Sequence, residues 1–137
     1  MTEPVYTLDI LRLAASLPLD TALADAHGRA EKRSSTCGSV IATEVRLDDG
    51  HLAGLAQQVQ ACAFGQASAA LLQKFAPNRS PVEIVAARVA MRSWLAGSGE
   101  PPTGFGVLAP ARTKAGRHGA MLLPFDALIA ALRDAGA

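Results

Sequence analysis

The sequence predicts an α+β fold, in which a small antiparallel sheet packs with several helices. Residues 40–47 alternate with a period of two and include several β-branched side chains, which is the pattern of a half-buried strand. Four other stretches repeat apolar residues at intervals of three or four, as amphipathic helices do. These stretches are 5–17, 62–75, 81–95 and 121–135.

Residues 40–60 are predicted to form a β-hairpin. Asp49-Gly50 is a two-residue turn sequence, because both residue types tolerate positive φ. The returning strand alternates poorly, so its register depends on the turn, and paired positions then add up to 99. Without a bulge, this register would place Cys37 opposite Cys62, with their Cα atoms about 4.5–5.5 Å apart.

Cys37 and Cys62 are the only cysteines of the chain. Cys62 stands at or just before the start of the predicted helix 62–75, where backbone N–H groups favour an anionic thiolate. Gly38 follows Cys37 and lets the backbone open around the sulfur. Two close thiols could bind a soft metal, carry sulfur or undergo redox chemistry, whereas free cysteines elsewhere are often small buried hydrophobic residues.

The composition excludes several classes of protein. The 137 residues are enough for one domain with a sizeable core, and a net charge of +1 gives no reason to expect nucleic acid or an anionic membrane as a partner. Two cysteines are too few for a secreted disulfide scaffold, and the first residues lack the pattern of a signal peptide. No apolar run approaches the ~18–20 residues of a membrane span. We expect a single cytoplasmic domain, 1–137, with reduced thiols.

Two further elements follow from local signals. The polar stretch 28–35 is predicted to pair as a solvated edge strand, where charges discourage aggregation, and a basic docking surface is the alternative interpretation. Ser80 and Glu83 have the spacing of a capping box and predict the start of helix 81–95, which Gly97 ends. Two apolar stripes run along this helix: Val82, Val85 and Val89 form one, and Ile84, Ala87 and Met91 form the other.

The stretch 97–119 is rich in Gly and Pro and predicts a long connection, of a length that is often functional or mobile. It ends in four basic or imidazole side chains, which either form a solvated loop or act beside the cysteines: Arg112, Lys114, Arg117 and His118. The last helix is expected over 121–135, with Pro124 tolerated in its first turn.

The order and spacing of these motifs resemble the U-type iron–sulfur cluster scaffold family, the group of the NifU N-terminal domain, IscU and SufU. Members carry Cys-Gly-Asp, a hairpin, Gly-Cys before a helix of small residues, and a third cysteine that opens the last helix. Here the matching motifs are Ser-Thr-Cys-Gly-Ser-Val at 35–40, the Asp-Gly hairpin, Ala-Cys-Ala-Phe-Gly-Gln-Ala-Ser at 61–68 and Arg-His-Gly-Ala at 117–120. The resemblance spans about residues 5–135.

The chain departs from the family pattern at three positions. Ser39 replaces the aspartate that follows the first cysteine, Ala61 replaces the glycine before the second cysteine, and Ala120 replaces the third cysteine. The two cysteines remain, and His118, two residues before the missing cysteine, is the candidate for a further metal ligand.

The resemblance implies about three antiparallel strands with helices packed on one face, and a non-catalytic function in iron–sulfur cluster assembly. Cys37 and Cys62 would receive sulfur from a cysteine desulfurase and bind iron, zinc or a transient iron–sulfur cluster for cluster-accepting proteins, because thiolates are preferred ligands for all of these. Two alternatives stay open: a thiol sulfur carrier, and a degenerate scaffold paralogue that acts as a protein-interaction module. The sequence leaves both a monomer and a homodimer open.

Overall fold

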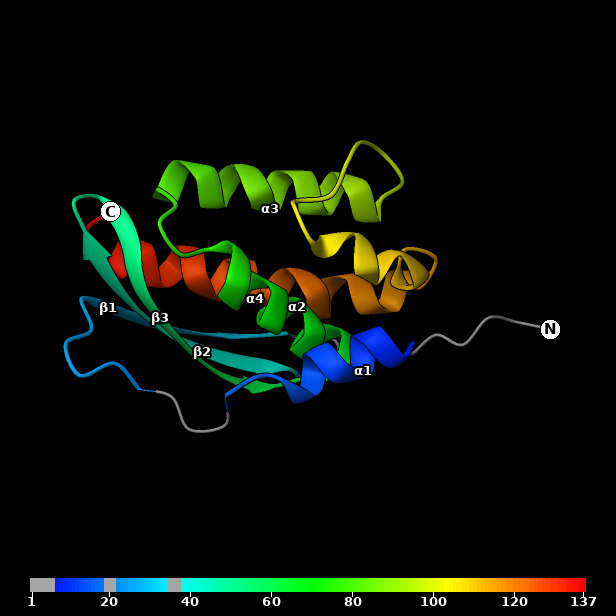
Figure 1. Cartoon of the computed structure of the whole chain (residues 1–137), viewed down its shortest axis with the longest axis horizontal. Helices are drawn as coiled ribbons and strands as arrows, with labels where there is room; N and C mark the ends of the chain where they lie inside the picture. The colour runs from blue at the N-terminus through cyan, green and yellow to red at the C-terminus, as the bar shows by residue number, and fades with distance from the viewer. Residues whose placement is uncertain (1–6, 19–21, 35–37) are drawn as a thin grey trace.

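The computed structural model describes residues 7–18, 22–34 and 38–137 (Figure 1). Within these ranges the chain has the predicted α+β architecture, with a three-stranded antiparallel sheet in the order β1-β2-β3. The strands are β1 (Gly28–Arg33), β2 (Val40–Asp48) and β3 (His51–Gln60). The helices are α1 (Leu8–Ala15), α2 (Ala63–Phe75), α3 (Pro81–Leu95), the 3-10 helix η1 (Phe105–Ala111) and α4 (Ala115–Asp134).

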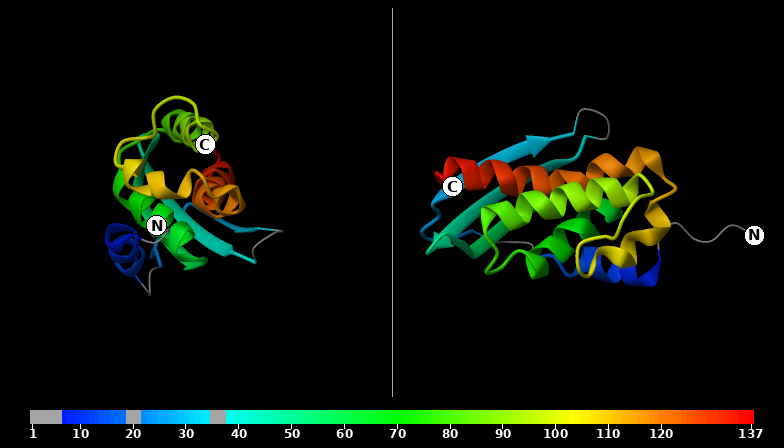
Figure 2. Two further views of the ribbon diagram at one scale, coloured as in Figure 1. Left: turned by 90° about the vertical axis from the view of Figure 1, so that its right-hand side faces the viewer. Right: turned by 90° about the horizontal axis from the view of Figure 1, so that it is seen from above.

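The helices gather on one face of the sheet, as predicted. Figure 1 and Figure 2 show α2 and α4 against the sheet, α3 on the far side of α4, and α1 beside α2. Ile41 and Val45 of β2 point into this layer and are fully buried. None of the helices in the described part of the chain is long and apolar enough to cross a membrane.

A β-bulge makes the register of the hairpin differ from the predicted one. Asp49 and Gly50 form the turn with φ of 53° and 77°, and the first two pairs of residues follow the predicted register. An irregularity between Arg46 and Leu47 then shifts the pairing by one residue, and the shift persists to the pair of Val40 with Gln60. The predicted register, in which paired positions add up to 99, is therefore wrong from Arg46 to Val40.

The bulge also explains why β3 alternates poorly. Such an insertion exchanges the two faces of a strand. Accordingly, Leu52 is buried before the irregularity, whereas Leu55 and Gln57 are buried after it. Cys37 itself lies outside the described residues, so its predicted distance from Cys62 stays a prediction.

The last helix begins earlier than predicted. α4 starts at Ala115, and η1 occupies part of the stretch 97–119 that was predicted to be one long connection. Phe105 and Leu108 of η1 are fully buried, so apolar packing fixes a stretch whose Gly and Pro content favours a loop. Pro124 consequently lies in the middle of α4 rather than in its first turn.

Gly28→Ala is expected to destabilise the protein by about 1–3 kcal/mol, because a Cβ on Gly28 would lie 2.2 Å from the Ala131 carbonyl oxygen and 2.7 Å from the Ala135 nitrogen. Urea unfolding followed by circular dichroism measures the change. The matched control is Gly116→Ala, where the new Cβ meets nothing within 4 Å. Stability equal to that of the parent in Gly28→Ala would contradict the close contact of β1 with α4.

Glu44→Gln is expected to lower the melting temperature at pH 7, and the difference from the parent protein is expected to shrink as the pH falls. The Arg29 guanidinium hydrogen bond and the Leu23 backbone N–H lower the pKa of Glu44 below its ordinary value of 4.5. A lowered pKa in the folded state stabilises the protein above pH 4.5, and this contribution disappears as the pH falls through the folded value. Thermal melts of both proteins between pH 3 and pH 7 test this, and a constant difference across the range would refute it.

Candidate functional site

Cys62 stands where β3 passes into α2. It is the N-cap residue of α2, with extended backbone angles of −65° and 171°, and its carbonyl oxygen accepts the Gln66 N–H at 2.9 Å. The side chain is a half-buried free thiol. The predicted position of Cys62 at a helix start is therefore confirmed, and the first-turn N–H groups of such a helix favour an anion nearby.

A surface hollow of about 450 Å³ opens beside Cys62. Its lining brings together the end of β3, the start of α2 and the segment that leads into β2: Gly38, Ser39, Val59, Gln60, Ala61, Cys62 and Gln66. Ser39, at the position of the family aspartate, is 3% exposed, and its carbonyl oxygen accepts the Ser34 N–H at 2.8 Å. The two residues that follow Cys37 thus share a hollow with Cys62, although Cys37 itself is outside the described residues.

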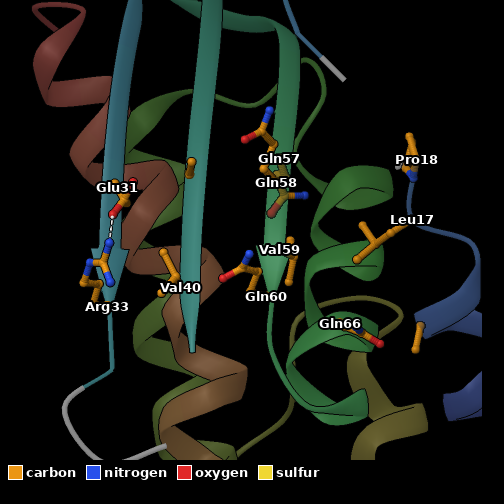
Figure 3. Close-up of a pocket in the computed structure, with 12 residues that line it drawn as sticks. Leu17, Pro18, Glu31, Arg33, Val40, Gln57, Gln58, Val59, Gln60 and Gln66 are labelled. Carbon is orange, nitrogen blue, oxygen red and sulfur yellow. Dashed lines mark ion pairs between the residues drawn. The ribbon is translucent and has the colours of Figure 1, made fainter. Parts of the chain in front are cut away.

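A neighbouring hollow of about 490 Å³ lies on the open face of the sheet, next to the end of α1 (Figure 3). It shares Val59, Gln60 and Gln66 with the hollow at Cys62. Most of its lining is aliphatic or carries side-chain amides, and its charged residues, Glu31 and Arg33, form an ion pair at 2.9 Å. This surface offers hydrogen bonds and apolar contacts directly beside the thiol.

Ala120 lies against the first turn of α2. A Cβ on Gly65 would be 3.2 Å from the Ala120 carbonyl oxygen and 3.5 Å from the Ala120 Cβ. Gly65 follows Cys62 by three residues, which is about one helical turn. The position of the missing third cysteine therefore lies at the Cys62 end of α2. Ala120 is 2% exposed, so a larger side chain there would enter a packed contact.

His118 is part of the first turns of α4 and does not precede the helix as predicted. Its Nε2 atom is 2.9 Å from the carbonyl oxygen of Arg112. Because a carbonyl only accepts, Nε2 carries the proton in this contact, and Nδ1 is the ring atom left for a metal. Arg112 is also committed elsewhere: its Nε donates to the Trp94 carbonyl at 2.8 Å, and its guanidinium lies 5.0 Å from the Trp94 ring centroid.

The predicted ligands do not form a complete metal site within the described residues. Across 7–18, 22–34 and 38–137, no three side chains of His, Cys, Asp or Glu gather closely enough to hold a metal ion. Cys37 was not among them because it lies outside these ranges. A shared metal at Cys37, Cys62 and His118 therefore stays a prediction.

Sequence reasoning missed Gln60 and Gln66, which line the hollow beside the thiol. Each side chain can both donate and accept hydrogen bonds to a ligand or a partner. Gln66 follows Cys62 by four residues, a spacing that places two residues on the same side of a helix. That spacing was a usable signal in the sequence, whereas the position of Gln60 depends on the shifted register of β3.

The chain was compared with protein families, curated proteins and solved structures. No protein-family model and no curated relative matches the chain. The N-terminal part of a NifU-like protein from Brucella abortus superposes with a TM-score of 0.88 at 31% identity, covering 96% of this chain and 94% of that chain. A protein from Fervidobacterium islandicum, described as an iron–sulfur cluster assembly scaffold for the SUF system, superposes with a TM-score of 0.85 at 18% identity, covering 93% of this chain and 96% of that chain. The second likeness supports the fold alone. The first, at 31% identity over nearly all of both chains, shows that this protein belongs to the U-type scaffold family of NifU N-terminal domains.

Proposed function

We propose that this protein is a scaffold-like, non-catalytic component of iron–sulfur cluster assembly, and that it holds iron, zinc or transient sulfur on Cys62 together with Cys37. The observation that carries the proposal is the position of Cys62, a half-buried thiol at the N-cap of α2 beside a hollow of about 450 Å³. Membership of the family and the affinity of thiolates for iron and zinc support the same assignment.

The local geometry suits a thiolate ligand. A metal binds the deprotonated form of cysteine, and the half-buried sulfur of Cys62 lines the hollow where a metal could bind. The hollow beside Cys62 leaves room for a cluster or for a side chain of a partner, and the amides of Gln60 and Gln66 can hydrogen-bond to what binds there. Reduced thiols require a reducing compartment, so we place the protein in the cytoplasm.

Sulfur would reach this thiol from a cysteine desulfurase. The Cys62 thiolate would attack the outer sulfur of a persulfide on the desulfurase, forming a new sulfur–sulfur bond as the old one breaks. The products are a persulfide on Cys62 and a free thiolate on the desulfurase. Cluster-accepting proteins are the second class of partner in this proposal.

The donor set predicts weak retention of a metal or cluster. Tetrahedral zinc and each iron of a cluster need a filled coordination shell. Ser39 and Ala120 bring no thiolate, so water, the Nδ1 atom of His118 or a partner must complete the shell. Weak retention is useful to a protein that passes its cargo on.

Cys62→Ser is expected to remove most of the iron or zinc bound by anaerobically prepared protein, because it deletes the thiolate at the hollow. Elemental analysis of the purified protein measures the metal content.

His118→Asn is expected to reduce zinc binding several-fold, and His51→Asn, which changes a histidine on the hairpin turn, is the matched control. Metal content unaffected by Cys62→Ser would refute the proposal. If so, the intact mass of the parent protein after treatment with a desulfurase tests whether it carries sulfur without a metal. A gain of one sulfur atom is the expected result for a sulfur carrier.

Ala120→Cys combined with Ser39→Asp is expected to tighten zinc binding at least ~10-fold, which corresponds to about 1.4 kcal/mol. The reason is that Ala120 and Ser39 lie at the Cys62 end of the domain. Competition with a chromogenic zinc chelator under reducing conditions measures the affinity. Ala120→Ser with Ser39→Asp is the matched control, since serine adds similar bulk without a thiol. Equal affinities in the two variants would show that the third position does not converge with Cys62.

A further inference from the structure

Only one of the two apolar stripes of α3 is buried. Ile84 and Met91 pack on the core and are 0% exposed. The other stripe faces outward: Val82 is 77%, Val85 42% and Val89 58% exposed. Valine is a weaker helix former than alanine, leucine or glutamate, so helix propensity does not explain three valines on an exposed helix face. A contiguous apolar stripe on a surface indicates a contact with another molecule more often than single exposed residues do.

The stripe borders a groove of about 440 Å³ between α3, α4 and the end of β1. Figure 2 shows the arrangement from above, with α4 lying between α3 and β1. Val85 and Val89 form the α3 side of the groove, and Ile129 and Ala130 of α4 add an apolar floor. Apolar and charged residues thus contribute equally to the lining of the groove, five of each.

Its charges are strongly unbalanced. Four basic side chains and one carboxylate line it: Lys32, Arg33, Arg88, Arg133 and Asp126. The whole chain, by contrast, has 13 basic and 12 acidic residues. Asp126 is bound by Arg88, and Arg33 pairs with Glu31 outside the groove. Lys32 and Arg133 form no ion pair with any residue in the described ranges.

We propose that this groove binds an acidic, amphipathic helix of a partner protein. Aliphatic side chains of that helix lie against Val85, Val89 and Ala130, and its carboxylates pair with Lys32 and Arg133. Helices bind apolar grooves in this way in many complexes, with anchors at intervals of three and four residues. Charge complementarity then selects an acidic helix over a basic one.

The groove suits a protein better than nucleic acid or a membrane. Its lining contains no aromatic side chain on which a base could stack. A concave surface does not insert into a lipid interface as a projecting apolar face does. The proposal is independent of the function proposed for Cys62, because none of the groove residues lines the hollow at the thiol.

The test is a titration of the ¹⁵N-labelled full chain with a synthetic helical peptide that has leucines at intervals of three and four and glutamates at its remaining positions. The expected result is saturable binding, with amide shifts confined to α3, α4 and the end of β1. Val85→Ser with Val89→Ser should weaken binding at least ~10-fold, equivalent to about 1.4 kcal/mol. Leu8→Ser with Leu11→Ser, which changes side chains 60% and 46% exposed on α1, is the matched control and should leave the affinity unchanged.

Charge-reversal variants measure the electrostatic contribution to peptide binding separately from the apolar one. Lys32→Glu with Arg133→Glu should weaken binding of the acidic peptide at least ~10-fold at low salt, and the loss should shrink as added salt screens the charges. Arg46→Glu with Lys74→Glu carries the same change in net charge away from the groove and should have little effect.

Three outcomes would overturn the proposal. One is the absence of saturable shifts, and another is shifts that map outside the groove. The third is that the peptide fails to bind, whereas phosphatidylserine vesicles or a DNA duplex bind the parent protein and bind the Lys32→Glu and Arg133→Glu variant more weakly. That result would assign the basic side chains to a different class of partner.

Discussion

The close contact of α2 with α4 is the constraint on which the rest of the structure depends. The Ser68 hydroxyl donates to the Met121 carbonyl oxygen at 2.7 Å in a buried contact, and Gly65 lies against Ala120 one turn earlier. A buried hydroxyl without a hydrogen-bond partner would destabilise the fold. This hydrogen bond therefore fixes the position of α2 relative to α4 along their axes. Small side chains make the approach possible, which gives the alanine-rich composition of α2 a structural reason.

The same helix, α4, is held at its other end by the sheet. Gly28 of β1 lies so close to the backbone of Ala131 and Ala135 that no side chain fits between them. Two glycines, Gly65 and Gly28, therefore bring α2 and the sheet against opposite ends of one helix. Pro124 between them has no N–H to donate to the Ala120 carbonyl, which is the carbonyl that faces Gly65.

This arrangement separates two surfaces of different character. The hollow at Cys62 lies where β3 meets the start of α2, and it offers a thiol with neighbouring amides. The groove lies along α3, α4 and β1 and offers valines with unpaired basic side chains. The groove extends along α4 to Leu123, three residues from Ala120, but it shares no lining residue with the hollow at Cys62.

The sequence alone determined the features that depend on neighbouring residues. The turn at Asp49-Gly50, the capping box of Ser80 with Glu83 and the start of α2 at Cys62 all follow from local φ preferences and local hydrogen bonds. The tertiary structure decided the rest, including the bulge beside Arg46. The start of α4 at Ala115 depends on the buried side chains of η1. No pattern of neighbouring residues in the sequence predicts that burial. Likewise, both stripes of α3 have helical spacing, and only the position of α4 determines which stripe is buried, because an apolar residue is buried by its partner and not by its own sequence.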